Sequence, residues 1–210
     1  MKILFQGDSI TDAFRDRNNE ISVGTGYPLL VKASIGLNDP GEYEFLNRGI
    51  SGNRIVDIYA RIKSDIINLK PDVMSILVGV NDVWHEFYES PNGVDEDKFY
   101  KIYDMLIQEV KEALPNIKIM IMEPFTLKGF ETEPMWESFS AEVKKRAKMA
   151  KKIADKYSLP FIELQSGFDE LAQKCSTDYW LRDGVHPTPM GHEYIKNEWI
   201  KAFNNMKGVE

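Results

Sequence analysis

The chain has 210 residues, of which 43% are hydrophobic and 28% are charged, and this fits one globular domain spanning residues 1–210. Its formal net charge of −7 argues against a nucleic-acid partner and fits a neutral substrate. No apolar run approaches the roughly 20 residues of a membrane span, and the start lacks the pattern of a signal peptide. With Cys175 as the only cysteine, a disulfide framework is excluded, and we expect a cytoplasmic protein without a membrane partner.

Five short runs rich in apolar and β-branched residues are separated by segments of helical periodicity. The runs predicted as strands are Lys2–Phe5, Tyr43–Leu46, Val73–Val78, Lys118–Met122 and Pro160–Leu164. Regular alternation of apolar strands with helices is typical of a parallel sheet covered by helices on both faces. We therefore predict an α/β fold.

Apolar residues recur at helical spacing between and after these strands. The predicted helices are centred on Tyr27–Ile35, Ile55–Ile67, Phe99–Val110, Glu137–Tyr157, Phe168–Ala172 and Gly191–Met206. The densest basic run, Lys144–Lys152, fits a solvated face of one of these helices better than a binding patch.

Two long irregular segments, residues 86–97 and 124–134, each come after a strand or the short segment that follows it. Such segments lie at the carboxyl edge of a parallel sheet, where they are candidates to wall a pocket. Their aromatic side chains fit pocket lining and packing beneath the loops equally well. These aromatic residues are Phe87, Tyr88, Phe125, Phe130 and, just beyond, Trp136.

Ser9 lies in the stretch Gly7–Thr11, which directly follows the first strand and passes into a helical pattern. Ligands bind beyond the carboxyl ends of the strands in open α/β sheets, and a following helix directs N–H donors to that place. Ser9 is therefore a candidate nucleophile. A serine at this position is equally well explained as a helix N-cap, so the interpretation needs partners elsewhere in the chain.

A serine nucleophile needs a base, a group that orients the base, and donors for the oxyanion. Among the three histidines, His186 has a carboxylate, Asp183, three residues before it. In a turn, this spacing lets the acid bond one ring nitrogen and leaves the other for a hydroxyl proton. His192 begins the last predicted helix and fits a structural role. His85 has no carboxylate at comparable spacing except the nearby Asp82 and Glu86.

Candidate oxyanion donors follow the second and third predicted strands. Gly52 lies in a glycine-rich turn where the backbone N–H can approach a ligand, and Asn81 carries a side-chain amide. Each turn alone is an ordinary strand-to-helix connection. Together with Ser9, His186 and Asp183 they place a hydroxyl, two donors and an acid–imidazole pair at one edge of the sheet.

Competing motifs do not match. The chain has no G-x-x-x-x-G-K-[ST] phosphate loop, and Gly24–Gly26 lacks the third glycine of a dinucleotide fingerprint. Ser51 is not in a G-x-S-x-G nucleophile elbow, and no Cys/His cluster has the spacing of a zinc site. We expect neither a metal nor a cofactor.

Four segments resemble, in order, the four blocks of the SGNH hydrolases, also called GDSL-type esterases. They are Gly7–Thr11, Gly49–Asn53, Gly79–Asp82 and Asp183–His186. The resemblance spans nearly the whole chain. It implies the SGNH hydrolase fold, a flavodoxin-like three-layer α/β/α sandwich with five parallel strands.

The same resemblance implies a role for each matched residue. Ser9 would be the nucleophile, His186 the base and Asp183 its orienting acid. The oxyanion hole would consist of the Ser9 and Gly52 N–H groups and the Asn81 side chain.

Finer features resemble the acetylxylan esterase branch, which removes acetyl groups from xylo-oligosaccharides. They are Gly24–Tyr27, Gly79–Trp84, Glu123–Phe125 and Asp183–His192. This resemblance implies a homo-oligomer and points to substrate contacts from Asp8, Tyr27, Trp84 and Phe125. The chain departs from the branch at His85, where an arginine is usual.

Three functions follow as hypotheses. The first is a serine esterase that removes acetyl groups from acetylated carbohydrates through an acetyl-enzyme. The second keeps this chemistry but acts on another small acyl ester, as a thioesterase or lysophospholipase does. The third is a non-catalytic ligand-binding domain on the same fold, because fold alone does not determine function.

Overall fold

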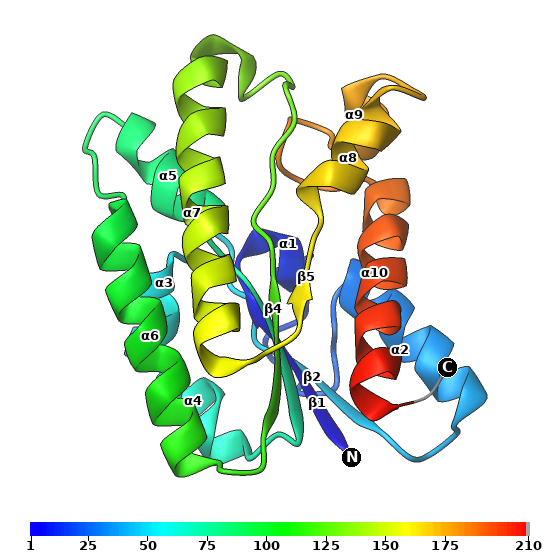
Figure 1. The fold of residues 1–210 in the computed structure, drawn as a ribbon. Coiled ribbons are helices and arrows are strands. Elements are labelled where there is room, and N and C mark those ends of the chain that lie inside the picture. Colours follow the sequence, from blue (N-terminus) through cyan, green and yellow to red (C-terminus); the bar gives the residue numbers. More distant parts are fainter. Residues whose placement is uncertain (209–210) are drawn as a thin grey trace.

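The computed structural model describes residues 1–208, and its five strands form a parallel sheet in the order β2-β1-β3-β4-β5 (Figure 1). The strands are β1 (Lys2–Gly7), β2 (Glu44–Asn47), β3 (Val73–Leu77), β4 (Lys118–Met122) and β5 (Phe161–Ile162). The predicted α/β fold with a five-stranded parallel sheet is confirmed. In this strand order the chain reverses its winding between β1 and β3, and ligands bind at such a switch point.

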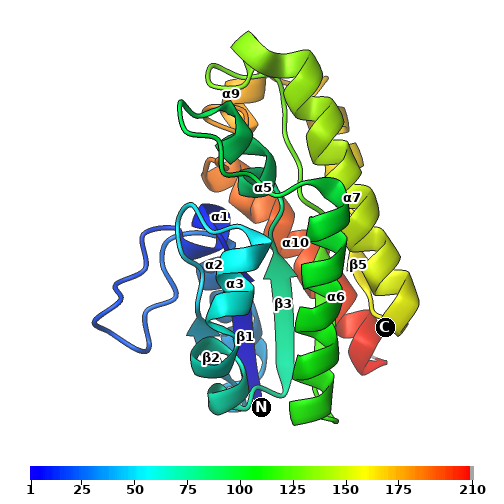
Figure 2. The ribbon, with the colours of Figure 1, turned by 90° about the vertical axis from the view of Figure 1, so that its left-hand side faces the viewer.

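Helices cover both faces of the sheet (Figures 1 and 2). One face carries α2 (Tyr27–Asn38), α8 (Gln165–Ala172) and α10 (Pro189–Lys207). The other carries α3 (Ile55–Ala60), α4 (Ile62–Asp65), α6 (Glu96–Ala113) and α7 (Trp136–Tyr157). The short helical turns are α1 (Ser9–Asp12), η1 (Ile67–Leu69), α5 (Val80–Trp84), η2 (His85–Phe87), η3 (Glu133–Met135) and α9 (Thr177–Trp180). Within residues 1–208, none of the helices combines the length and the apolar character needed to cross a bilayer.

The central strands are buried on both faces, and alternate residues of β1 enter two different cores. Ile3 and Phe5 pack on the side of α2 and α10, where the Phe5 ring centroid lies 5.5 Å from that of Trp199. Leu4 points the other way and joins the core with Ile107 of α6. This two-sided burial explains why the strands read as nearly continuous apolar runs.

The helix predicted over residues 55–67 is interrupted in the structure. At Arg61 the backbone leaves helical geometry, with φ −111° and ψ 17°, and separates α3 from α4. Its guanidinium donates to Gln6 Oε1 at 2.7 Å and to the Gly7 carbonyl at 3.3 Å, at the end of β1. The prediction of one continuous helix is wrong because these tertiary hydrogen bonds cannot be read from apolar spacing.

The fifth strand is shorter than the predicted run Pro160–Leu164. Only Phe161–Ile162 pairs with β4. The N–H groups of Leu164 and Gln165 both donate to Glu123 Oε2, at 2.8 and 2.9 Å, so the chain has left the sheet by this point.

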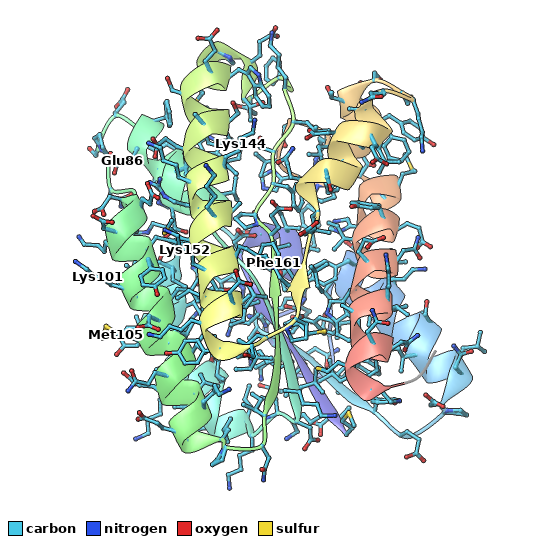
Figure 3. The ribbon with its side chains drawn as sticks, in the orientation of Figure 1. Glu86, Lys101, Met105, Lys144, Lys152 and Phe161 are labelled. Carbon is cyan, nitrogen blue, oxygen red and sulfur yellow. The ribbon has the colours of Figure 1, made fainter. Side chains whose placement is uncertain are left out.

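The basic run lies on α7, where the exposed side chains of Lys144 and Lys152 lie on the outer side of the helix (Figure 3). Arg146, in contrast, is buried and donates to the carbonyl of Val94 at 2.8 and 3.1 Å. The lysines therefore form a solvated helix face, and the arginine fixes the loop before α6.

Candidate active site

Ser9 lies at the first position of α1, directly beyond the end of β1. Asp8 is the N-cap of this helix, because its Oδ1 accepts the Ile10 N–H at 3.0 Å. The hydroxyl of Ser9 is therefore not used as a cap, and it lies 2.9 Å from Nε2 of His186. The two residues are 177 positions apart in the sequence.

Asp183 holds the other nitrogen of the same imidazole. Its Oδ2 lies 2.6 Å from Nδ1 of His186, and its Oδ1 accepts the N–H groups of Val185 and His186 at 2.9 and 2.8 Å. Gly184, with φ +100°, permits this tight turn. Burial acts to raise the pKa of Asp183, but the hydrogen bonds from His186 and Val185 outweigh it and lower the pKa to about 2. The ionised acid therefore favours a proton on Nδ1 and leaves Nε2 free to accept the Ser9 proton.

Three candidate oxyanion donors, the N–H groups of Ser9 and Gly52 and the side chain of Asn81, accompany the hydrogen-bonded Ser9–His186–Asp183 arrangement. In the described part of the chain the N–H groups of Ser9 and Gly52 donate to no other residue. Gly52 has φ +81°. Asn81 donates one amide hydrogen to the Asn53 carbonyl at 3.2 Å, which ties it to the Gly52 turn and leaves its second hydrogen for a ligand.

Asn47, which sequence reasoning did not single out, holds the end of β2 against the nucleophile turn. This fully buried residue donates to the carbonyls of Thr11 and Val23 at 2.6 and 2.9 Å. Its Oδ1 accepts the Gly49 N–H at 2.8 Å. At Gly49 a Cβ would lie 2.3 Å from the Asp12 nitrogen, so only glycine permits this close approach. The signal available in the sequence was a polar residue ending an otherwise apolar strand.

Two buried carboxyls lie behind the candidate donors. Both oxygens of Asp82 accept the Ile55 N–H, at 3.0 and 3.2 Å, and thereby fix the start of α3. Burial raises the pKa of Asp82 to about 8 and that of Asp8 to about 7. Among the described residues, Oδ2 of Asp8 has no hydrogen-bond partner.

A pocket of about 680 Å³ opens beside the Ser9–His186 pair, which forms part of its lining. The loop after α1 and the segment from Arg182 to Pro189 supply most of the remaining lining. Phe14, from the first of these, has φ +60° and is 81% exposed. An aromatic side chain held in this uncommon conformation beside a pocket offers a flat apolar face to a ligand.

The predicted substrate contacts are only partly compatible with the structure. Tyr27 and Phe125 are fully buried; Tyr27 shares a hydrogen bond with Thr11 at 3.1 Å, and the Phe125 ring lies 4.5 Å from that of Phe168. Asp8, 1% exposed, lies behind the nucleophile. We correct the prediction for these three residues: burial leaves them supporting the site rather than touching a substrate. Trp84 is partly exposed, and its ring centroid lies 5.9 Å from that of His186, so it stays a candidate contact.

The other two histidines have structural partners. Nδ1 of His192 accepts the Tyr27 N–H at 3.1 Å, and burial lowers the pKa of His192 to about 4, which keeps the acceptor neutral. His85 lies 3.1 Å from Oδ1 of Asn92 and packs on Tyr88 with ring centroids 4.8 Å apart.

Both long loops lie within the described residues, and neither supplies a residue to the lining of the pocket beside Ser9, so the expectation that they wall a pocket is not met there. Their aromatic side chains pack beneath the loops or are exposed. Phe125 packs in the core, whereas Phe130 is 82% exposed. Phe87 packs on Phe139, with centroids 5.9 Å apart, and is 40% exposed. Within residues 1–208, no three His, Cys, Asp or Glu side chains gather as metal ligands.

Comparison with known proteins places this chain among ester hydrolases. Residues 5–194 match the sequence model of the GDSL-like Lipase/Acylhydrolase family. An acetylxylan esterase from Geobacillus stearothermophilus is 32% identical over 209 residues, which cover 96% of this chain and 93% of that protein.

Solved structures of related proteins have the same fold over nearly the whole chain. A putative GDSL-like lipase from Parabacteroides merdae has a TM-score of 0.88 at 36% identity, over 96% of this chain and 94% of the other. A catalytic mutant of the Geobacillus acetylxylan esterase has a TM-score of 0.85 at 30% identity, over 96% and 93%. The predicted SGNH hydrolase fold is confirmed by these similarities.

Proposed function

Because the chain belongs to the GDSL-like lipase/acylhydrolase family, we propose that it is a serine esterase that removes acetyl groups from acetylated oligosaccharides, with xylo-oligosaccharides as the preferred substrates. The observation that carries this proposal is the hydrogen-bonded series from Ser9 through His186 to Asp183 at the edge of a pocket. The similarity to an acetylxylan esterase supports acetyl as the acyl group.

In the first half of the reaction, Oγ of Ser9 attacks the acetyl carbonyl carbon while Nε2 of His186 takes the hydroxyl proton. Asp183, ionised, stabilises the imidazolium that forms. The carbonyl oxygen gains a negative charge, which the N–H groups of Ser9 and Gly52 and the Asn81 amide stabilise. The carbon–oxygen bond to the sugar then breaks, and the imidazolium gives its proton to the departing sugar hydroxyl.

In the second half, water replaces the sugar. Nε2 of His186 takes a proton from this water as its oxygen attacks the acetyl-serine carbonyl. The same donors stabilise the second oxyanion. When the bond to Ser9 breaks, the proton returns to Oγ, and acetate leaves.

The pocket supports a carbohydrate ligand. Its volume of about 680 Å³ lies within the range of small-molecule sites. The exposed ring of Phe14, which lines the pocket, provides a flat face on which the C–H side of a sugar ring can lie. The partly exposed ring of Trp84, on His186, provides a second such face outside the pocket lining.

Acetate release from acetylated xylo-, manno- and cello-oligosaccharides tests this proposal. We expect release from at least one of them, fastest from the xylo series, and loss of on the order of 10³-fold or more in Ser9→Ala. Rapid hydrolysis of octanoyl esters without acetate release from any sugar would instead favour the second hypothesis. Failure of an organophosphate to label Ser9 would favour the non-catalytic binding domain.

A further inference from the structure

The pocket beside Ser9 is positively charged although the whole chain carries a net charge of −7. Arg15, Arg17 and Arg182 line it, and Asp12 is the single carboxylate among the lining residues. His186 and His192 complete the titratable lining. A concave site in which one sign of charge predominates focuses the field and attracts ligands of the opposite sign.

Two of these arginines have structural partners. The Arg15 side chain is 8% exposed, and its Nε donates to the Gly49 carbonyl at 2.9 Å and lies 4.0 Å from Oδ1 of Asp12. The hydrogen bond to Gly49 ties Arg15 to the turn after β2. Arg17 donates to Oδ2 of Asp12 at 2.8 Å, and the same oxygen accepts the Ser51 N–H at 3.1 Å. Because the Arg17 side chain is 53% exposed, the rest of its guanidinium stays accessible from the pocket.

Arg182 has no such partner. Its exposed side chain makes no hydrogen bond and no ion pair with any group in residues 1–208. Its backbone, however, is firmly placed: its N–H donates to the His186 carbonyl at 2.9 Å, and the bridge between Leu181 and Pro187 closes the same turn. The guanidinium therefore extends from the turn that carries Asp183 and His186.

We propose that Arg182, together with Arg17, binds an anionic group on the sugar, so that the substrate is an acidic acetylated oligosaccharide. The planar guanidinium donates paired hydrogen bonds to a carboxylate or a phosphate. A uronic acid and a sugar phosphate ester are the two sources of this chemistry. The inference rests on the proposed function and specifies its substrate class.

The test compares kcat/KM for acetate release from three acetylated substrates. They are a neutral xylo-oligosaccharide, the same oligosaccharide bearing a glucuronic acid, and a sugar phosphate. We expect one of the two acidic substrates to exceed the neutral one by about tenfold, the contribution of one hydrogen bond to a charged group. The preference for the acidic substrate should decrease as salt is added. Whichever of the two acidic substrates is hydrolysed faster than the neutral one shows whether the anionic group is a carboxylate or a phosphate.

Arg182→Gln removes the charge and keeps much of the length of the side chain. It should remove most of the preference for the acidic substrate, measured as the ratio of kcat/KM on the acidic substrate to kcat/KM on the neutral one. The matched control is Lys152→Gln, which removes one exposed positive charge from the outer side of α7 (Figure 3) and should leave the ratio unchanged. Equal rates on all three substrates, or a ratio that Arg182→Gln leaves intact, would overturn this inference while the deacetylase function stands. Hydrolysis of p-nitrophenyl acetate without acetate release from any sugar would overturn both.

Discussion

Replacing Asp183 by asparagine tests whether the carboxylate sets the tautomer of His186. In the parent, Oδ1 of Asp183 accepts two backbone N–H groups, from Val185 and His186, and Oδ2 faces Nδ1 of His186. An asparagine has one acceptor oxygen and one donor NH₂. If its NH₂ faced the backbone, two N–H donors would lose their acceptor, at a cost of about 1–3 kcal/mol each.

This cost determines how the asparagine is oriented. Its oxygen stays on the two backbone N–H groups, and its NH₂ points at Nδ1 of His186. Nδ1 must then be the acceptor, which places the imidazole proton on Nε2, opposite the Ser9 hydroxyl. A base that already carries a proton at Nε2 cannot accept one from Ser9, so we expect kcat to fall by on the order of 10⁴. This loss corresponds to about 5 kcal/mol of transition-state stabilisation.

The assay is initial-rate hydrolysis of p-nitrophenyl acetate together with the melting temperature Tm of each variant. The turn keeps both backbone hydrogen bonds, so Asp183→Asn should melt within a few degrees of the parent. Asp178→Asn, the same substitution at an exposed residue of α9, serves as control and should keep full activity. A folded Asp183→Asn variant that retains kcat within about tenfold of the parent would refute the tautomer argument.

Three further predictions concern the donors and the scaffold. Asn81→Ala should lower kcat by roughly 10²–10³-fold on p-nitrophenyl acetate, because one oxyanion donor is removed; an unchanged kcat would exclude Asn81 from that role. Asn47→Ala leaves two buried carbonyls and one N–H without partners, so chemical denaturation should show a free energy of unfolding lower by about 2–4 kcal/mol. Burial raises the pKa of Asp82 from 3.8 to about 8, so between these pH values the folded state holds a proton that the unfolded state has released. Tm should therefore fall as pH rises from 4 to 8, and Asp82→Asn should flatten this fall; an identical slope in both proteins would contradict the assignment.

The sheet and the candidate triad were predictable from the sequence because each depends on a simple rule. Apolar runs of strand length alternate with helical periodicity, and the carboxyl ends of parallel strands share one edge. Ser9 and Asn81 follow neighbouring strands, β1 and β3, so they must lie near one another once the sheet forms. The spacing of Asp183 and His186 needed only a turn, which Gly184 permits.

Resemblance to a motif did not reveal which residues face the pocket. Tyr27 and Phe125 stand in segments that resemble a substrate-binding branch, but both side chains point into the core. For Tyr27 the helical spacing was the better guide, because it opens α2 and shares the buried face of that helix with Val31 and Ile35. Phe125 lies in an irregular segment, where no periodicity relates the position of a residue to the direction of its side chain.

The nucleophile's position depends on tertiary contacts more than on its own motif. α1 is a single turn of four residues, and a helix this short does not form alone in water. It is held by the Asp8 cap, by the hydrogen bond from Asn47 to the Thr11 carbonyl, and by Asp12, which accepts the Ser51 N–H. Two of these three contacts come from β2 and the turn after it. The segment formed by β2 and the turn after it, which supplies Gly52 as a candidate donor, therefore also fixes Ser9, so the distance between nucleophile and donor is set by one shared set of hydrogen bonds.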